Sequence, residues 1–133
     1  MKRTHLLISA LAICACSSVF AADDAADPNP SVANADGSDA RKVTELGQAN
    51  WAPYWHPSGE KIIFASNHKS ERGFPFTLFM INVDGTGLEQ VSYGDTFDAF
   101  PVFSPDGKHL VFSSNRNNGG TRETNLFLAE WQD

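Results

Sequence analysis

After Arg41, apolar residues occur in short runs that are rich in β-branched and aromatic side chains. Glycine, proline, asparagine and aspartate separate these runs, and almost none of them shows the 3.6-residue period of a helix. The pattern therefore predicts an all-β domain. The expected strands are WAPYWHP (51–57), KIIFASN (61–67), FTLFMINV (76–83), LEQVSYG (88–94), AFPVFSP (99–105), HLVFSSN (109–115) and TNLFLAEW (124–131).

The runs form an internal repeat with an offset of 48 residues. WHPSGEKIIFASN (55–67) matches FSPDGKHLVFSSN (103–115), and the register holds without a gap across the whole unit. A period of this length is typical of stacked supersecondary units such as propeller blades. A complete blade is expected to contain four short antiparallel strands; the first copy supplies four and the second supplies three, and the copies cover about 43–90 and 91–133.

The residues that match between the copies are those that bend and pack the chain. Pro57-Ser58-Gly59 and Pro105-Asp106-Gly107 suit a tight hairpin in which proline presets φ and glycine supplies a positive φ. Asp84-Gly85 is a further hairpin signal. A catalytic loop would depend on its polar side chains, and these differ between the two proline turns. We therefore interpret both turns as architecture.

Several of these motifs together resemble the WD40-like propeller repeats of the TolB family. They are SPDGK, LVFSSN and NLFLAEW in the second copy and LFMINVDGTGLEQVS in the first. The resemblance covers about residues 43–131 and implies β-propeller blades in an exported protein. It implies no particular ligand, because this blade occurs in transport-associated proteins, in peptidase propeller domains and in many other exported proteins.

A propeller needs roughly four to eight blades, whereas this chain contains two copies of the repeat. A further strand, Lys42–Gly47, aligns with Gln90–Asp95, so the strands suffice for two complete blades. One hypothesis is that chains associate, for instance three of them in a six-bladed ring in which each Lys42–Gly47 strand completes a neighbour's blade. The alternative is a truncated remnant of a longer propeller protein.

The N-terminal segment has the features of an export signal. Two basic residues precede the apolar run 6–13, and Val19-Phe20-Ala21 offers a small-residue cleavage site. Both cysteines of the chain lie inside this segment, so they form no disulfide framework for the domain. We predict a signal peptide over 1–21 and a periplasmic protein. Alternatively, Cys16 follows a lipobox-like sequence, the signal covers 1–15, and lipidation of Cys16 anchors the protein to the outer membrane.

Residues 22–40 contain small, polar and acidic residues and almost no large apolar residue, which predicts a disordered acidic linker. The chain carries a formal net charge of −6. An acidic surface repels phosphate backbones, so a nucleic-acid partner is disfavoured.

No combination of residues points to catalysis or to a metal site. His56, His68 and His109 do not share a repeat position, and no carboxylate has metal-ligand spacing to two of them. The sequence lacks the Gly-x-Ser-x-Gly motif of a nucleophilic serine. NVDGTGLE (82–89) contains oxygen donors but lacks the spacing of an EF-hand loop, so we interpret it as a hairpin. We expect no enzymatic activity, no cofactor and no metal.

Aromatic residues crowd the first strand of each copy, where they either pack between blades or form a binding surface. The loops 68–76 and 116–124 join equivalent strands, are expected on one face, and carry basic residues in an otherwise acidic chain. The candidate partner-binding residues are Trp51, Tyr54, Trp55, Phe97, Arg72, Phe74, Arg116 and Arg122.

These observations favour a non-enzymatic binding or scaffold module that mediates protein interactions in the periplasm or at the outer membrane, as the resemblance to TolB-like proteins implies. The alternatives are an accessory propeller of an exported peptidase or hydrolase system and a glycan binder that would use the aromatic residues. The expected partners are proteins of the cell envelope. A membrane contact is expected only through a lipid anchor, and a homo-oligomer would complete a propeller ring.

Overall fold

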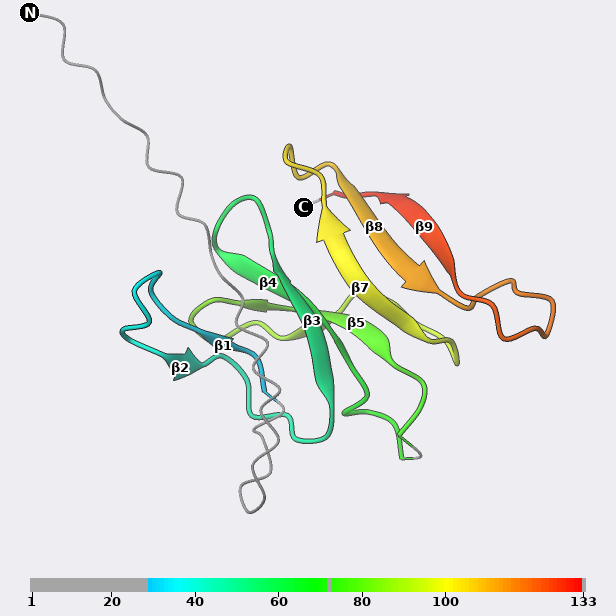
Figure 1. Ribbon diagram of the computed structural model, residues 1–133, viewed down its shortest axis with the longest axis horizontal. Helices are drawn as coiled ribbons and strands as arrows, with labels where there is room; N and C mark the ends of the chain where they lie inside the picture. Colours follow the sequence, from blue (N-terminus) through cyan, green and yellow to red (C-terminus); the bar gives the residue numbers. More distant parts are fainter. Residues whose placement is uncertain (1–28, 72, 133) are drawn as a thin grey trace, which may run out of the picture.

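The computed structural model describes residues 29–71 and 73–132, which form nine strands and no helix. The strands make three antiparallel sheets in the orders β1-β2, β3-β4-β5-β6 and β7-β8-β9, with the two larger sheets packed against each other (Figure 1). The all-β prediction is confirmed, and no described segment is a helix that could span a membrane. The strands are β1 (Ser31–Val32), β2 (Arg41–Lys42), β3 (Asn50–Trp55), β4 (Lys61–Ser66), β5 (Thr77–Asn82), β6 (Glu89–Gln90), β7 (Asp98–Phe103), β8 (His109–Ser114) and β9 (Asn125–Glu130).

The 48-residue offset of the sequence repeat also relates the strands of the structure. It places β3, β4 and β5 on β7, β8 and β9 with identical lengths. The strand register repeats as well, since Ile63 lies opposite Met80 and Val111 lies opposite Leu128. Both turns predicted at the proline motifs are present, and Gly59 and Gly107 have positive φ angles of 76° and 71°. The repeat thus specifies local conformation down to single residues.

The offset extends further towards the N-terminus than the sequence motifs indicate. β1 pairs with β2 as β5 pairs with β6: Ser31 lies opposite Lys42, and Phe79 lies opposite Gln90. The structure therefore contains three repeat units. We call them the N-terminal unit (29–46, partial), the central unit (49–94) and the C-terminal unit (97–131).

The structure differs from the predicted linker over residues 29–40, where it has β1 and an ordered turn. Asp36 Oδ1 accepts hydrogen bonds from the backbone N and the hydroxyl of Ser38, and these local bonds order the turn without large apolar residues. Val32 and Val43 then anchor the unit on the central sheet. Residues 22–28, the predicted signal peptide and Cys16 lie outside the described residues.

The strand expected over Lys42–Gly47 is shorter than predicted and is paired within its own chain. Only Arg41–Lys42 is a strand, and β1 occupies its hydrogen-bonding edge. Completing a neighbour's blade with this segment, as in the ring hypothesis, would require the β1–β2 pairing to open.

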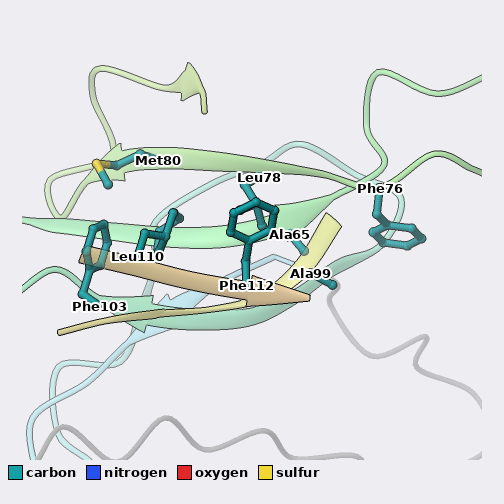
Figure 2. Close-up of a cluster of buried hydrophobic side chains, with 9 residues drawn as sticks. Ala65, Phe76, Leu78, Met80, Ala99, Phe103, Leu110 and Phe112 are labelled. Atoms are coloured by element: carbon teal, nitrogen blue, oxygen red, sulfur yellow. The ribbon is translucent and has the colours of Figure 1, made fainter. Parts of the chain in front are cut away.

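The central sheet is the hydrophobic centre of the molecule because both of its faces are covered. One face packs Leu78 and Met80 against Phe103, Leu110 and Phe112 of the C-terminal unit (Figure 2). The opposite face packs against the N-terminal unit. That second cluster contains Val43, Ile62, Phe64, Phe79 and Ile81. Fully burying one such side chain contributes about 2 kcal/mol, so these two interfaces hold the units together.

Candidate functional site

Three of the sequence-predicted aromatic residues surround one buried ring, that of Phe76. The Trp51 ring stacks on Phe76 with a centroid distance of 4.3 Å, and Phe74 and Phe97 lie at 5.5 and 5.9 Å from it. Phe76 itself is buried and is not among the predicted residues. The signal available in the sequence was its position at the start of the apolar run FTLFMINV (76–83). The structure thus brings together Trp51, Phe74 and Phe97 at the junction of the central and C-terminal units.

Beside this cluster lies an open hollow of about 560 Å³, which we call the loop pocket. Its walls come from the loop between β4 and β5 and from the segments that flank β7 and β8. The lining residues are Lys69, Ser70, Glu71, Phe74, Pro75, Asp95, Phe97 and Asn115.

Two asparagines at equivalent repeat positions shape the loops around the pocket. Asn67 Oδ1 accepts a hydrogen bond from Ala49 N at 2.9 Å, and Asn115 Oδ1 accepts one from Phe97 N at 2.8 Å. Asn67 Nδ2 also donates to Gly73 O at 2.8 Å. The asparagine that follows the second strand of each unit therefore fixes the start of that unit, and Asn67 also fixes the loop that lines the pocket.

The charged side chains of the loop pocket differ in the interactions that they make with the rest of the described chain. Lys69 Nζ donates to Gln90 Oε1 at 3.0 Å and lies 5.3 Å from the centre of the Phe79 ring. Glu71 and Asp95 are exposed and form no ion pair or side-chain hydrogen bond with the rest of the described chain. Among the described lining residues, Glu71 and Asp95 are therefore the charged groups without a side-chain partner.

The remaining predicted residues lie elsewhere. Tyr54 Oη donates to Phe103 O at 3.5 Å across the interface between two units, and Trp55 packs on the opposite face of the central sheet. Arg122 is exposed on the loop between β8 and β9. Arg72 lies outside the described residues. Tyr54, Trp55 and Arg122 therefore do not form one site with Phe74 and Phe97.

Arg116 is held inside the chain by a buried carboxylate. Its Nη2 donates to Asp98 Oδ2 at 2.6 Å, and its guanidinium lies over the rings of Phe112 and Phe127. Asp98 is fully buried and also accepts a hydrogen bond from Ser114 Oγ. Arg116 thus has a structural partner, whereas the sequence pointed to a ligand.

The equivalent positions of the central unit are Asn50, Ser66 and His68, which are uncharged polar residues or histidine; Ser66 and His68 contact each other, whereas Asn50 Nδ2 donates to Gly47 O. His68 Nδ1 lies 3.0 Å from Ser66 Oγ, and the His68 ring packs 4.4 Å from Phe79. Burial, assisted by the charge of Lys69, lowers the pKa of His68 below 6.5. The neutral imidazole is therefore the favoured form in the folded protein.

Residues 82–89 form the predicted hairpin. Asp84 Oδ1 accepts hydrogen bonds from the backbone N and the hydroxyl of Thr86, and these bonds lower the pKa of Asp84. Within residues 29–71 and 73–132, no three histidine, cysteine, aspartate or glutamate side chains come together in a way that could hold a metal ion.

A second candidate surface is found when the exposure of equivalent residues in the two larger units is compared. Leu126 and Leu128 of β9 are 75% and 70% exposed, whereas the equivalent Leu78 and Met80 of β5 are 0% and 1% exposed. The C-terminal unit covers the central residues, and no described residue covers the equivalent face of the C-terminal unit. We call this surface the open face; it consists of Val102, Val111, Leu126 and Leu128.

The open face ends at a free strand edge. In the central sheet, β6 pairs with β5 and places Gln90 opposite Phe79. In the C-terminal sheet, β9 is the outer strand and has no further strand beside it in the described part of the chain (Figure 1). An apolar face next to unpaired backbone groups is suited to receive another β-strand.

Comparisons with known proteins identify the fold. No protein-family model matches the chain, and no curated protein sequence matches it. The putative TolB from Agrobacterium tumefaciens matches 77% of this chain with a TM-score of 0.64 at 22% sequence identity. TolB from Acinetobacter baumannii also covers 77% of the chain, at 14% identity and with a TM-score of 0.33, which is too low to support a fold assignment.

The chain spans 37% and 35% of the lengths of these two structures. The match to the Agrobacterium protein confirms the predicted β-propeller architecture and the structural resemblance to TolB. The described residues therefore have the fold of blades in a TolB-like β-propeller.

Proposed function

We propose that this chain is a non-enzymatic protein-binding module of the cell envelope and that it binds its partner through the open face. The observation that carries this proposal is the contrast between Leu126 and Leu128 and their buried equivalents Leu78 and Met80. Because the two pairs share backbone position and apolar character, the exposed pair is suited to a sheet that packs on it. The TolB-like fold favours a periplasmic location.

The chemistry of the open face defines the kind of partner. It would be a protein that contributes an apolar sheet face to Leu126 and Leu128 and an edge strand to β9. Main-chain hydrogen bonds along β9 would supply affinity, and the alternating side chains would supply specificity. An accessory role beside an exported hydrolase would use the same surface, and the identity of the partner distinguishes these roles.

The test is a pair of double variants with the same change in charge. L126K/L128K places two charges on the open face at positions that are already exposed, so the fold is retained. L88K/Y93K places two charges on exposed apolar residues of the central unit. Proteins cross-linked to the wild-type chain in envelope extract are identified, purified and titrated against all three forms.

We expect binding to the wild type and to L88K/Y93K, and a loss of at least about tenfold in affinity with L126K/L128K, as for removal of an interface core. A partner that binds all three forms equally contradicts the proposal. A second copy of the chain as the partner would appear as a dimer mass that L126K/L128K abolishes, and this outcome supports the homo-oligomer hypothesis.

A further inference from the structure

In the N-terminal and central units, the segment beside the third strand carries the same two residue types, a valine followed by a hydroxyl residue. They are Val43-Thr44 beside β1 and Val91-Ser92 beside β5, and the two pairs are related by the repeat offset. Val43, Thr44 and Ser92 are buried, and Val91 is half-buried. In the C-terminal unit no described residue lies at the outer edge of the equivalent strand, β9. The two filled positions therefore indicate what the empty position accepts.

The valine makes the same backbone hydrogen bond in both units. Val43 N donates to Pro30 O at 2.9 Å, and Val91 N donates to Leu78 O at 2.8 Å. Both valine side chains pack in the interface between their own unit and the next one along the chain. Leu126 is the equivalent of Pro30 and Leu78 and belongs to the open face. A valine beside Leu126 would therefore extend the open face.

The hydroxyl residue pairs a backbone N–H where the third strand offers one. Leu78 N donates to Ser92 Oγ at 2.9 Å on the β6 side of β5. Pro30 has no N–H, and the hydroxyl of Thr44 bonds to a side chain there instead. Leu126 has an N–H, as Leu78 does, and the shared register directs this N–H towards the free edge of β9. A hydroxyl acceptor at this edge would complete the pattern of the central unit.

We infer that the edge of β9 binds an extended protein segment that runs antiparallel to β9 and contains valine followed by serine or threonine. The valine N donates to Leu126 O, the valine side chain lies on the open face, and the hydroxyl accepts from Leu126 N. Pairing with the sheet edge supplies affinity, and the two side chains supply selectivity. This inference rests on the proposed function because it specifies the strand that the partner contributes to β9.

The test is an NMR titration of the purified protein with short peptides that reproduce a segment of the chain itself. The parent peptide is LEQVSYG (88–94) with both ends blocked, and its variants are Ser92→Thr, Ser92→Ala and Val91→Lys. We expect shifts at residues 125–130 and similar affinity for the parent and Ser92→Thr peptides. Affinity should be about fivefold weaker for Ser92→Ala and at least about tenfold weaker for Val91→Lys. Equal affinity of the parent and Ser92→Ala peptides, shifts confined to residues 77–82, or no binding of the parent peptide would overturn the inference.

Two protein variants assign the selectivity to the N–H of Leu126. Leu126→Pro removes this N–H and introduces the residue that the N-terminal unit has at the equivalent position, whereas Leu126→Ala shortens the side chain and keeps the N–H. Leu126→Ala should still prefer the parent peptide over the Ser92→Ala peptide about fivefold, and Leu126→Pro should bind the two equally. The spectrum of each variant reports whether it is folded, and the peptide series on the wild type does not depend on either variant. A preference that Leu126→Pro retains would contradict the assignment.

The outcomes separate this inference from the proposed function. A partner that loses affinity for L126K/L128K, while no peptide binds selectively at β9, would overturn this inference and leave the open face as the docking surface. Selective peptide binding at β9, together with a partner that binds L126K/L128K as tightly as the wild type, would contradict the proposed function alone.

Discussion

At the scale of single residues, the central and C-terminal units have different polar side chains at three equivalent positions. The central unit places Asn50, Ser66 and His68 where the C-terminal unit places Asp98, Ser114 and Arg116. The charged version is fully bonded, with Asp98 accepting from both partners. In the neutral version, Asn50 Oδ1 is buried without a hydrogen-bond partner among the described residues. The repeat thus preserves the strand positions here, whereas the charge and the hydrogen bonds differ between the two units.

Removal of Arg116 should destabilise the protein because it leaves the Asp98 carboxylate buried and unpaired. We expect Arg116→Ala to lower the free energy of unfolding by about 3 kcal/mol, measured by chemical denaturation. The double variant D98N/R116H recreates the trio of the central unit and should lose less than Arg116→Ala. A double variant that is less stable than the single one would show that the two units are not interchangeable at these positions.

His68 should make stability depend on pH. Because its pKa is lowered in the folded state, the unfolded chain binds a proton at a higher pH than the folded chain does. The contribution of His68 is therefore complete above about pH 6.5 and is lost as the pH falls through its folded pKa. The melting temperature of His68→Asn, followed between pH 8 and pH 5, should fall less than that of the wild type. Parallel curves for the two proteins would contradict this assignment.

At the scale of elements, the strand positions could be predicted from the sequence because turn-forming residues recur at the same positions in both copies of the repeat. Proline, glycine and asparagine mark the same hairpins in both copies, and the apolar runs between them fit strands. β1 could not be predicted in this way, since the small polar residues around Asp36 resemble a linker by composition. A comparison of NADGS (34–38) with NVDGT (82–86) was the signal that extends the repeat.

The candidate site could be predicted only in part. The exposed Phe74 and the half-buried Phe97 follow from the loop and the aromatic pattern, but Phe76 between them depends on how two units meet. Arg116 illustrates the reverse case, because a basic residue on a loop indicates a ligand until its buried partner Asp98 is known. Contacts between units depend on tertiary packing, and a pattern within one unit does not report them.

The packing of the N-terminal unit on the central unit can be tested with two equivalent glycines. Gly37 and Gly85 have φ angles of 84° and 89°, so alanine at either position should cost about 1 kcal/mol of strain. A Cβ on Gly85 would also lie 3.1 Å from Val43 O, whereas a Cβ on Gly37 would have no atom within 4 Å. Gly85→Ala should therefore lose about 1 kcal/mol more than Gly37→Ala in chemical denaturation. Equal losses would argue against this contact.

At the scale of the whole molecule, the three units differ in how much neighbouring structure supports each of them. The central sheet is covered on both faces, and its strands β4 and β5 are almost entirely buried. The C-terminal sheet is covered on one face, so exposure alternates along β8 and β9. In repeat architectures stability is approximately the sum of the units and the interfaces between neighbours. The outer sheet should accordingly be the part of the described chain that a partner stabilises most.

This asymmetry predicts a gradient of amide hydrogen exchange between strands with the same backbone. β5 pairs on both edges and β9 on one, so peptides that cover 125–130 should exchange faster than peptides that cover 77–82. Mass spectrometry at low protein concentration measures both strands in one experiment, with β5 as the internal reference for β9. Equal protection of the two strands in the monomer would mean that the open face is covered within the chain itself. Protection of β9 that increases with protein concentration, and that L126K/L128K removes, would instead identify a second copy as the sheet that covers it.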